Sequence, residues 1–79
     1  MVTVRYFAGA KAAAGRGEEQ VSAADVRELK AVLAQRHGPA FGKVLSASTL
    51  LVDGLAAKDP ETALPAGVTV EVLPPFAGG

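Results

Sequence analysis

One amphipathic helix has to cover all the strands that this sequence predicts. Residues 25–37 carry apolar side chains at helical spacing: Val26, Leu29, Val32 and Leu33. Asp25 can accept hydrogen bonds from the first-turn amides, and Glu28 three residues later completes a capping box. Gly38 and Pro39 end the helix. No other long helix is predicted, so a sheet must bury one face against this helix.

The predicted strands alternate between apolar and polar residues. In residues 2–7, VTVRYF, and residues 68–73, VTVEVL, the first, third and fifth side chains are apolar and share one face. Shorter strands are expected at residues 18–22, 49–52 and 55–57. A hairpin turn joins the last two, because Asp-Gly tolerates the positive φ angles that such a turn needs.

Two connecting segments carry weaker signals. Residues 10–14 are predicted to form one helical turn after the first strand. Residues 39–48 are predicted as a loop that turns three apolar side chains inward, those of Phe41, Val44 and Leu45.

The order strand, strand, helix, strand, short strand, strand predicts an α+β fold. A mixed sheet of about four to five strands would pack on one main helix and leave its other face to water. This is the β-grasp, or ubiquitin-like, architecture, in which the first and last strands lie side by side and parallel. We expect one β-grasp domain over residues 1–73 and a flexible diglycine tail at residues 74–79.

Composition excludes several classes of function. The 79 residues carry eight basic and eight acidic side chains, which gives no basic footprint for nucleic acid. No apolar run is long enough to span a membrane, and the N-terminus lacks the pattern of a signal peptide. There is no cysteine, which fits a cytoplasmic protein and excludes a thiol nucleophile. His37, the single histidine, is expected to be a solvated residue at the helix end, and no metal site is expected.

The parallel neighbourhood of the first and last strands predicts which outward residues meet. Thr3 would lie beside Thr69 and Arg5 beside Glu71, as suits a wet sheet surface. A third pair, Phe7 and Leu73, is apolar and falls where the tail begins. It indicates a partner-binding patch, although the tail or the loop after Phe7 could also cover it.

The tail has an unusual composition. Pro74 and Pro75 remove two amide donors and stiffen the exit from the last strand. Gly78 and Gly79 have no side chains and fit a narrow channel, with a carboxylate at the tip. A frayed terminus is the alternative. Because the chain has no phosphate-binding loop of the GxxxxGK[ST] type, a separate enzyme would have to activate that carboxylate.

The start, VTVRYFAGAKAAAG, and the end, VTVEVLPPFAGG, resemble the small subunits of molybdopterin synthase, within the MoaD/ThiS sulfur-carrier family. The LLVDG hairpin and the helix fit the same pattern, and the resemblance covers essentially the whole chain. It implies a carrier that is not itself an enzyme. An E1-like adenylating enzyme (MoeB-like) uses ATP to activate the terminal carboxylate as an acyl-adenylate, and sulfur then replaces AMP to leave a thiocarboxylate. This chain itself binds no cofactor.

The resemblance also assigns roles to individual residues. Gly79 is the thiocarboxylate site, and the rest of the tail enters the large subunit of molybdopterin synthase (MoaE-like): Pro74, Pro75, Phe76, Ala77 and Gly78. Sulfur then passes to a pterin precursor for the molybdenum cofactor. Phe7 and Leu73 match apolar interface positions. Lys11 stands where relatives often have arginine. A bidentate salt bridge that arginine could make there would be weaker with lysine.

Two other functions stay open at the level of sequence. The chain could carry sulfur in a ThiS-like pathway to thiamine, cysteine or another thiolated metabolite. It could also be a ubiquitin-like protein modifier or a simple binding module.

Overall fold

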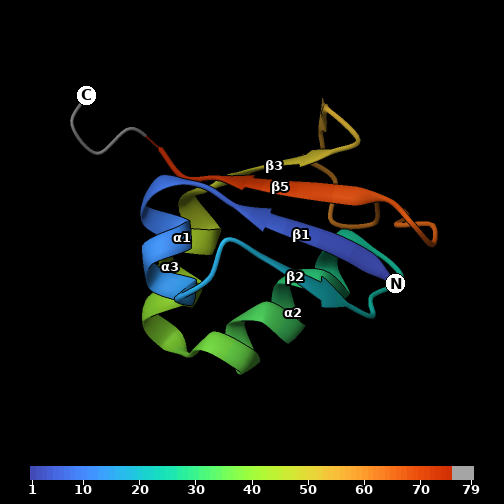
Figure 1. The fold of residues 1–79 in the computed structure, drawn as a ribbon. Helices are drawn as coiled ribbons and strands as arrows, with labels where there is room; N and C mark the ends of the chain where they lie inside the picture. Colours follow the sequence, from blue (N-terminus) through green and yellow to red (C-terminus); the bar gives the residue numbers. More distant parts are fainter. Residues whose placement is uncertain (76–79) are drawn as a thin grey trace.

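Five strands form one mixed sheet in the order β2-β1-β5-β3-β4. The structure is a computed structural model, and it describes residues 1–75. The strands are β1 (Val2–Tyr6), β2 (Glu18–Val21), β3 (Thr49–Val52), β4 (Leu55–Ala56) and β5 (Thr69–Leu73). The helices are α1 (Ala8–Ala14), α2 (Val26–His37) and α3 (Pro39–Ala47). Figure 1 shows the helices on one side of the sheet, so the ubiquitin-like β-grasp prediction is confirmed.

The first and last strands are parallel neighbours at the centre of the sheet. Thr3 pairs with Thr69 and Arg5 with Glu71, which is the register predicted from the sequence. β2 and β3 flank this central pair and are both antiparallel to it. Because β1 and β5 run in the same direction, their carboxyl ends meet at one edge of the sheet, next to α1 (Figure 1).

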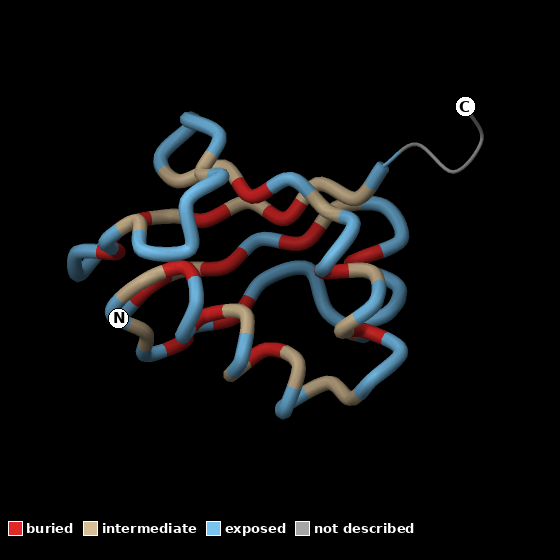
Figure 2. The backbone as a smooth tube through the Cα atoms, turned by 180° about the vertical axis from the view of Figure 1, so that it is seen from behind, coloured by how far each residue is buried: buried red, intermediate tan, exposed pale blue. Residues whose placement is uncertain are grey.

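The core lies between the sheet and the helices. Buried positions alternate along the strands, as Figure 2 shows. The fully buried side chains include Val4, Val70 and Val72 from the sheet and Leu29 and Leu33 from α2. Val26 is also buried, whereas Val32 of the predicted stripe is only partly so.

The predicted capping of α2 is confirmed with one difference of detail. Asp25 is the N-cap, and its Oδ1 accepts a hydrogen bond from the amide of Glu28 at 2.8 Å. The Glu28 carboxylate accepts in turn from the amide of Ala24, one residue before the cap, at 2.7 Å. The helix ends at Gly38, whose φ of 94° lies in the left-handed region.

The loop predicted at residues 39–48 is wrong, because residues 39–47 form α3. Pro39 takes the first helical position, where its missing amide hydrogen costs nothing. Phe41 and Leu45 are buried, one turn apart on the same face of α3. The predicted main helix is α2, α3 is an additional helix, and the helical turn expected at residues 10–14 is the longer α1.

The strand bounds differ by at most one residue from those expected. β1 ends at Tyr6, because Phe7 is already the N-cap of α1. The Asp53-Gly54 turn is confirmed by φ angles of 48° and 86°. Within residues 1–75, every helix is too short or too polar to cross a membrane.

Candidate functional site

Phe7 and Leu73 mark the edge of the sheet from which the tail leaves. They lie one residue beyond the Tyr6–Val72 pair, and the Phe7 amide donates to the Val72 carbonyl at 3.3 Å. Both side chains are half-buried. The adjacency predicted from the sequence is therefore confirmed. Of the tail residues that the structure describes, Pro74 is half-buried and Pro75 is exposed.

A tight connection between β1 and α1 sets the position of Phe7. Phe7 is extended, with φ −127° and ψ 152°, and Ala8 then takes a φ of 49°. A left-handed alanine is strained by about 1 kcal/mol. The Phe7 carbonyl accepts hydrogen bonds from Ala10 at 3.0 Å and Lys11 at 3.4 Å. The chain therefore turns at once beneath the sheet, and the Phe7 side chain stays at its surface.

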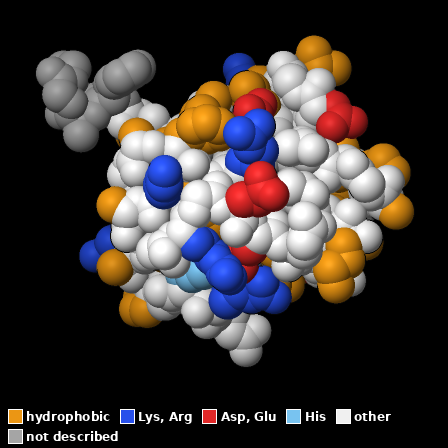
Figure 3. Space-filling model, in the orientation of Figure 1, with side chains coloured by type: hydrophobic (Ala, Val, Ile, Leu, Met, Phe, Trp, Pro, Cys, Tyr) orange, Lys and Arg blue, Asp and Glu red, His pale blue; other side chains and the backbone are white. Residues whose placement is uncertain are grey.

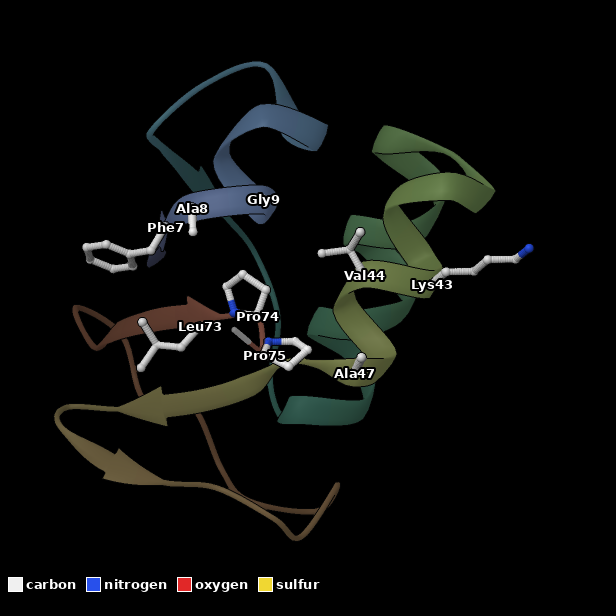
Figure 4. Close-up of a pocket in the computed structure, with 9 residues that line it drawn as sticks. All are labelled: Phe7, Ala8, Gly9, Lys43, Val44, Ala47, Leu73, Pro74 and Pro75. Carbon is white, nitrogen blue, oxygen red and sulfur yellow. The ribbon is translucent and has the colours of Figure 1, made fainter. Parts of the chain in front are cut away.

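An apolar groove lies beside Leu73, with a volume of about 610 Å³. Its lining residues come from the start of α1, from α3 and from the end of β5: Phe7, Ala8, Gly9, Lys43, Val44, Ala47, Leu73, Pro74 and Pro75. Figure 4 shows Val44 pointing toward the proline rings, which lie between α1 and α3, while the amine of Lys43 extends away. The first two tail residues thus form part of the wall of the groove.

A second hollow of about 430 Å³ lies on the other side of Phe7 and includes Lys11 in its lining. Arg5 also lines it, 5.7 Å from the centre of the Phe7 ring, and forms an ion pair with Glu18 at 3.6 Å. Arg5 lies opposite Glu71 in register, but the carboxylate within ion-pair distance is that of Glu18. The structure thus brings Lys11, Phe7 and Leu73 to one end of the molecule, and hydrophobic side chains gather there in Figure 3.

A buried polar cluster surrounds Glu19, and no sequence pattern pointed to it. The side chain of Glu19 is 2% exposed. It accepts a hydrogen bond from the Tyr6 hydroxyl, and Arg36 Nη1 donates to its Oε1 at 2.7 Å. His37 Nε2 lies 2.5 Å from Oε2, and Arg16 Nη1 lies 3.8 Å from Oε1. Figure 3 shows basic side chains around the histidine on this face.

The prediction that His37 is solvated is wrong, because only 11% of its side chain is exposed. Its ring is 4.9 Å from that of Phe41 and 5.9 Å from that of Tyr6, between centroids. His37 does lie at the end of α2, as expected. The histidine therefore joins the helix end to the sheet through Glu19 and does not face water.

The charge of Glu19 depends on its hydrogen bonds. Burial disfavours the ionised carboxylate, but hydrogen bonds from Tyr6, Arg36 and His37 outweigh burial and lower the pKa of Glu19 to about 2. Burial, together with the bond to Glu19, raises the pKa of Tyr6 above its ordinary value. The cluster links β1, β2 and α2. Its member on β1 is Tyr6, which directly precedes Phe7, and so the cluster helps to hold the end of β1.

The remaining predicted site residues, Phe76, Ala77, Gly78 and Gly79, lie outside the described residues. Residues 1–75 contain no cluster of three or more histidine or acidic side chains that could hold a metal ion.

Comparison with known proteins agrees with the family expected from the sequence. A family model described as the ThiS family matches residues 4–79. This chain belongs to the ThiS family. A search of curated proteins found no match. The family-level prediction, a ubiquitin-like sulfur-carrier family, is confirmed.

Solved structures similar to this ThiS-family chain include two of small archaeal modifier protein 1. The one from Haloferax volcanii has 26% identity and a TM-score of 0.84, covering 99% of this chain and 98% of that one. The one from Methanosarcina acetivorans has 25% identity and a TM-score of 0.85, covering 99% and 95%. A chain in the complex of subunits 1 and 2 of the molybdopterin-converting factor from Helicobacter pylori has 27% identity and a TM-score of 0.76, covering 99% and 97%.

Proposed function

We propose that this ThiS-family chain is a sulfur carrier that works through the carboxyl group of Gly79. A separate E1-like enzyme uses ATP to convert that group to an acyl-adenylate, and sulfur replaces AMP to give a thiocarboxylate. The observation that carries the proposal is the meeting of Phe7, Leu73 and the groove at the sheet edge where Pro74 leaves β5. A partner that takes up the tail would find an apolar surface beside it.

In the proposed role the carrier is the small subunit of molybdopterin synthase. Residues 74–79 enter the active site of the large subunit, and the thiocarboxylate gives its sulfur to a pterin precursor. The Helicobacter pylori complex supports this choice, because a chain of similar fold and 27% identity occurs there in an assembly of two subunits. The carrier contributes binding energy through Phe7, Leu73 and Lys11, and its cytoplasmic partners supply the chemistry.

The chain's own composition is consistent with a carrier that does not catalyse. It has no cysteine in its 79 residues, so a loaded sulfur would be held at the carboxyl group and not on a thiol. The one histidine is held against Glu19, and its side chain is only 11% exposed. The histidine is therefore not positioned to attack a substrate at the end of β5.

A protein modifier is the second candidate function, favoured by the similarity to small archaeal modifier protein 1. In that case the activated Gly79 carboxyl group would pass to an amine of a target protein and form an amide. The two functions share the activation step and differ in the product.

Intact-mass measurement tests the proposal. The carrier is incubated with the adenylating enzyme, ATP and a sulfur donor, and then with the large subunit and the pterin precursor. We expect a mass gain equal to the exchange of one oxygen for sulfur, which is lost again as molybdopterin forms. Branched species of higher mass would identify a modifier. A loaded carrier that yields no molybdopterin would indicate another sulfur pathway.

A further inference from the structure

Two exposed arginines meet at the buried carboxylate of Glu19. Arg16 lies between α1 and β2, and Arg36 lies in the last turn of α2. Their Nη1 atoms are 3.8 Å and 2.7 Å from the same oxygen, Oε1 of Glu19. Glu19 therefore holds two guanidinium groups from different elements side by side, on the face where Figure 3 shows basic side chains around the histidine.

The positive charge of this arginine pair exceeds the negative charge that holds it. Both guanidinium groups are always protonated, whereas Glu19 contributes a single negative charge. Within residues 1–75, neither arginine has a second carboxylate within ion-pair distance. Glu18, the neighbouring carboxylate, pairs instead with Arg5 at 3.6 Å. The described residues therefore leave at least one positive charge of the pair without a counter-charge.

Most hydrogen-bond donors of the arginine pair have no partner within residues 1–75. A guanidinium group carries five N–H donors in a planar fork. Arg36 donates through Nη1 alone, to Glu19 and, at 3.4 Å, to the Gln20 carbonyl. Arg16 Nη1, at 3.8 Å, is beyond hydrogen-bond distance of Glu19. Because the two side chains are 57% and 44% exposed, a ligand from solution can reach the remaining donors.

We infer that Arg16 and Arg36 form a binding site for an anion of the phosphate class, with each guanidinium group donating to separate oxygens of the ligand. Planar guanidinium donors match phosphate oxygens and bind them in pairs. Contact with Glu19 restricts both side chains in advance, so less rotamer freedom is lost on binding. Tyr6 and His37 bind Oε2 of Glu19, and these contacts keep the carboxylate in place.

This inference does not depend on the proposed function. Neither arginine lines the groove or the second hollow at the tail end of the molecule, and the carboxyl group of Gly79 takes no part. The anion has two possible sources, since it is either free in solution or part of a nucleotide. Inorganic pyrophosphate and ATP, both without metal ions, are therefore the two probes.

NMR titration of the unloaded full chain tests the site. At neutral pH and constant ionic strength, pyrophosphate should shift the side-chain Nε–H resonances of Arg16 and Arg36, and the shifts should saturate. Arg16→Gln and Arg36→Gln should each raise the dissociation constant at least about 5-fold. Arg27→Gln is the matched control, because it removes the same charge from an exposed arginine that pairs with Glu61. It should change the affinity by less than about 2-fold.

Arg16→Lys separates the planar fork from its charge. Lysine keeps the positive charge and loses the planar donors, so the affinity should fall at least about 3-fold. This position also spares the fold, because Arg36 and His37 keep their contacts with Glu19. Thermal unfolding verifies that each variant is folded. If Arg36→Gln does not fold, the two Arg16 variants still decide.

Saturable shifts at both arginines, weakened in the Arg16 variants, support the site. ATP that binds no tighter than pyrophosphate identifies a free phosphate ligand, and ATP that binds tighter identifies a nucleotide; both results support the inference. Shifts that do not saturate, or an equal loss in Arg27→Gln, indicate an adventitious ion only and overturn it. A polyglutamate peptide that binds the same arginines more tightly than pyrophosphate also overturns it, because the pair would then be a contact for acidic protein surfaces.

Discussion

Replacing Glu19 by glutamine should expose how much the buried polar cluster stabilises the end of β1. The substitution keeps the shape of the side chain and removes its charge. The Glu19 carboxylate binds Tyr6 from β1 and both Arg36 and His37 from α2. Without the charge, the ion pair between Glu19 and Arg36 is lost, and we expect the free energy of unfolding to fall.

The magnitude follows from the pKa of Glu19, which the folded protein lowers from 4.5 to about 2. A lowered pKa in the folded state adds stability above the unfolded value, and this is lost as the pH falls from about 4.5 to about 2. At about 1.36 kcal/mol per unit, the contribution at neutral pH is about 3 kcal/mol. Solvent screens it little, because the side chain is only 2% exposed.

Urea unfolding followed by circular dichroism measures this effect. At pH 7, Glu19→Gln should lower the free energy of unfolding by about 3 kcal/mol, and at pH 2.5 the gap to the wild type should shrink to below about 1 kcal/mol. Glu18→Gln is the matched control on the same strand, where the carboxylate is 58% exposed, and it should change little. A gap that stays constant with pH, or equal effects of the two variants, would refute the reasoning.

Three further substitutions, one of them with a matched control, test the partner surface, the cap of α2 and the core. Phe7→Asp should weaken binding of the large subunit at least about 10-fold, because it puts a charge into an apolar contact. Leu55→Asp should leave that binding unchanged, and a large fall in melting temperature for Phe7→Asp would instead place Phe7 in the core. Asp25→Ala removes the 2.8 Å cap bond to the Glu28 amide and should cost about 1 kcal/mol in urea unfolding; no change would show that the cap adds nothing. Leu33→Ala, at a side chain with 0% exposure, should cost about 2–5 kcal/mol, and a smaller loss would mean that the site collapses.

The sheet was predictable from the sequence because its signals are local and periodic. Alternation in residues 2–7 and 68–73, with a single long helix to cover them, was enough to predict the parallel neighbours Thr3 and Thr69. That register in turn brought Phe7 next to Leu73. The candidate interface was thus derived from pattern and topology.

The helix α3 was missed because Gly38 and Pro39 can mark either the end of one helix or the start of the next. They end α2, as predicted, but proline also favours the first position of a new helix. The spacing of Phe41, Val44 and Leu45 was the available signal, since these residues share one helical face. The groove depends on α3, so the sequence could not reveal it.

The cluster around Glu19 could not be predicted for a different reason. Its partners Arg36 and His37 are 17 and 18 residues away in sequence, on another element. Alternation along β2 predicts an inward side chain at position 19, but not which polar groups satisfy it. Only the packing of α2 across the sheet decides that, and it leaves just 11% of the His37 side chain exposed where a surface residue was expected.

The most direct test is the mass of the C-terminal peptide of the carrier after incubation with the adenylating enzyme, ATP and a sulfur donor. We predict sulfur in place of one carboxyl oxygen at Gly79, and its disappearance when the large subunit and the pterin precursor are added. A folded variant without Gly79 should take up no sulfur and support no transfer. Full molybdopterin formation by that variant, or by a carrier that stays a free acid throughout, would contradict the proposal that the tail carries the sulfur.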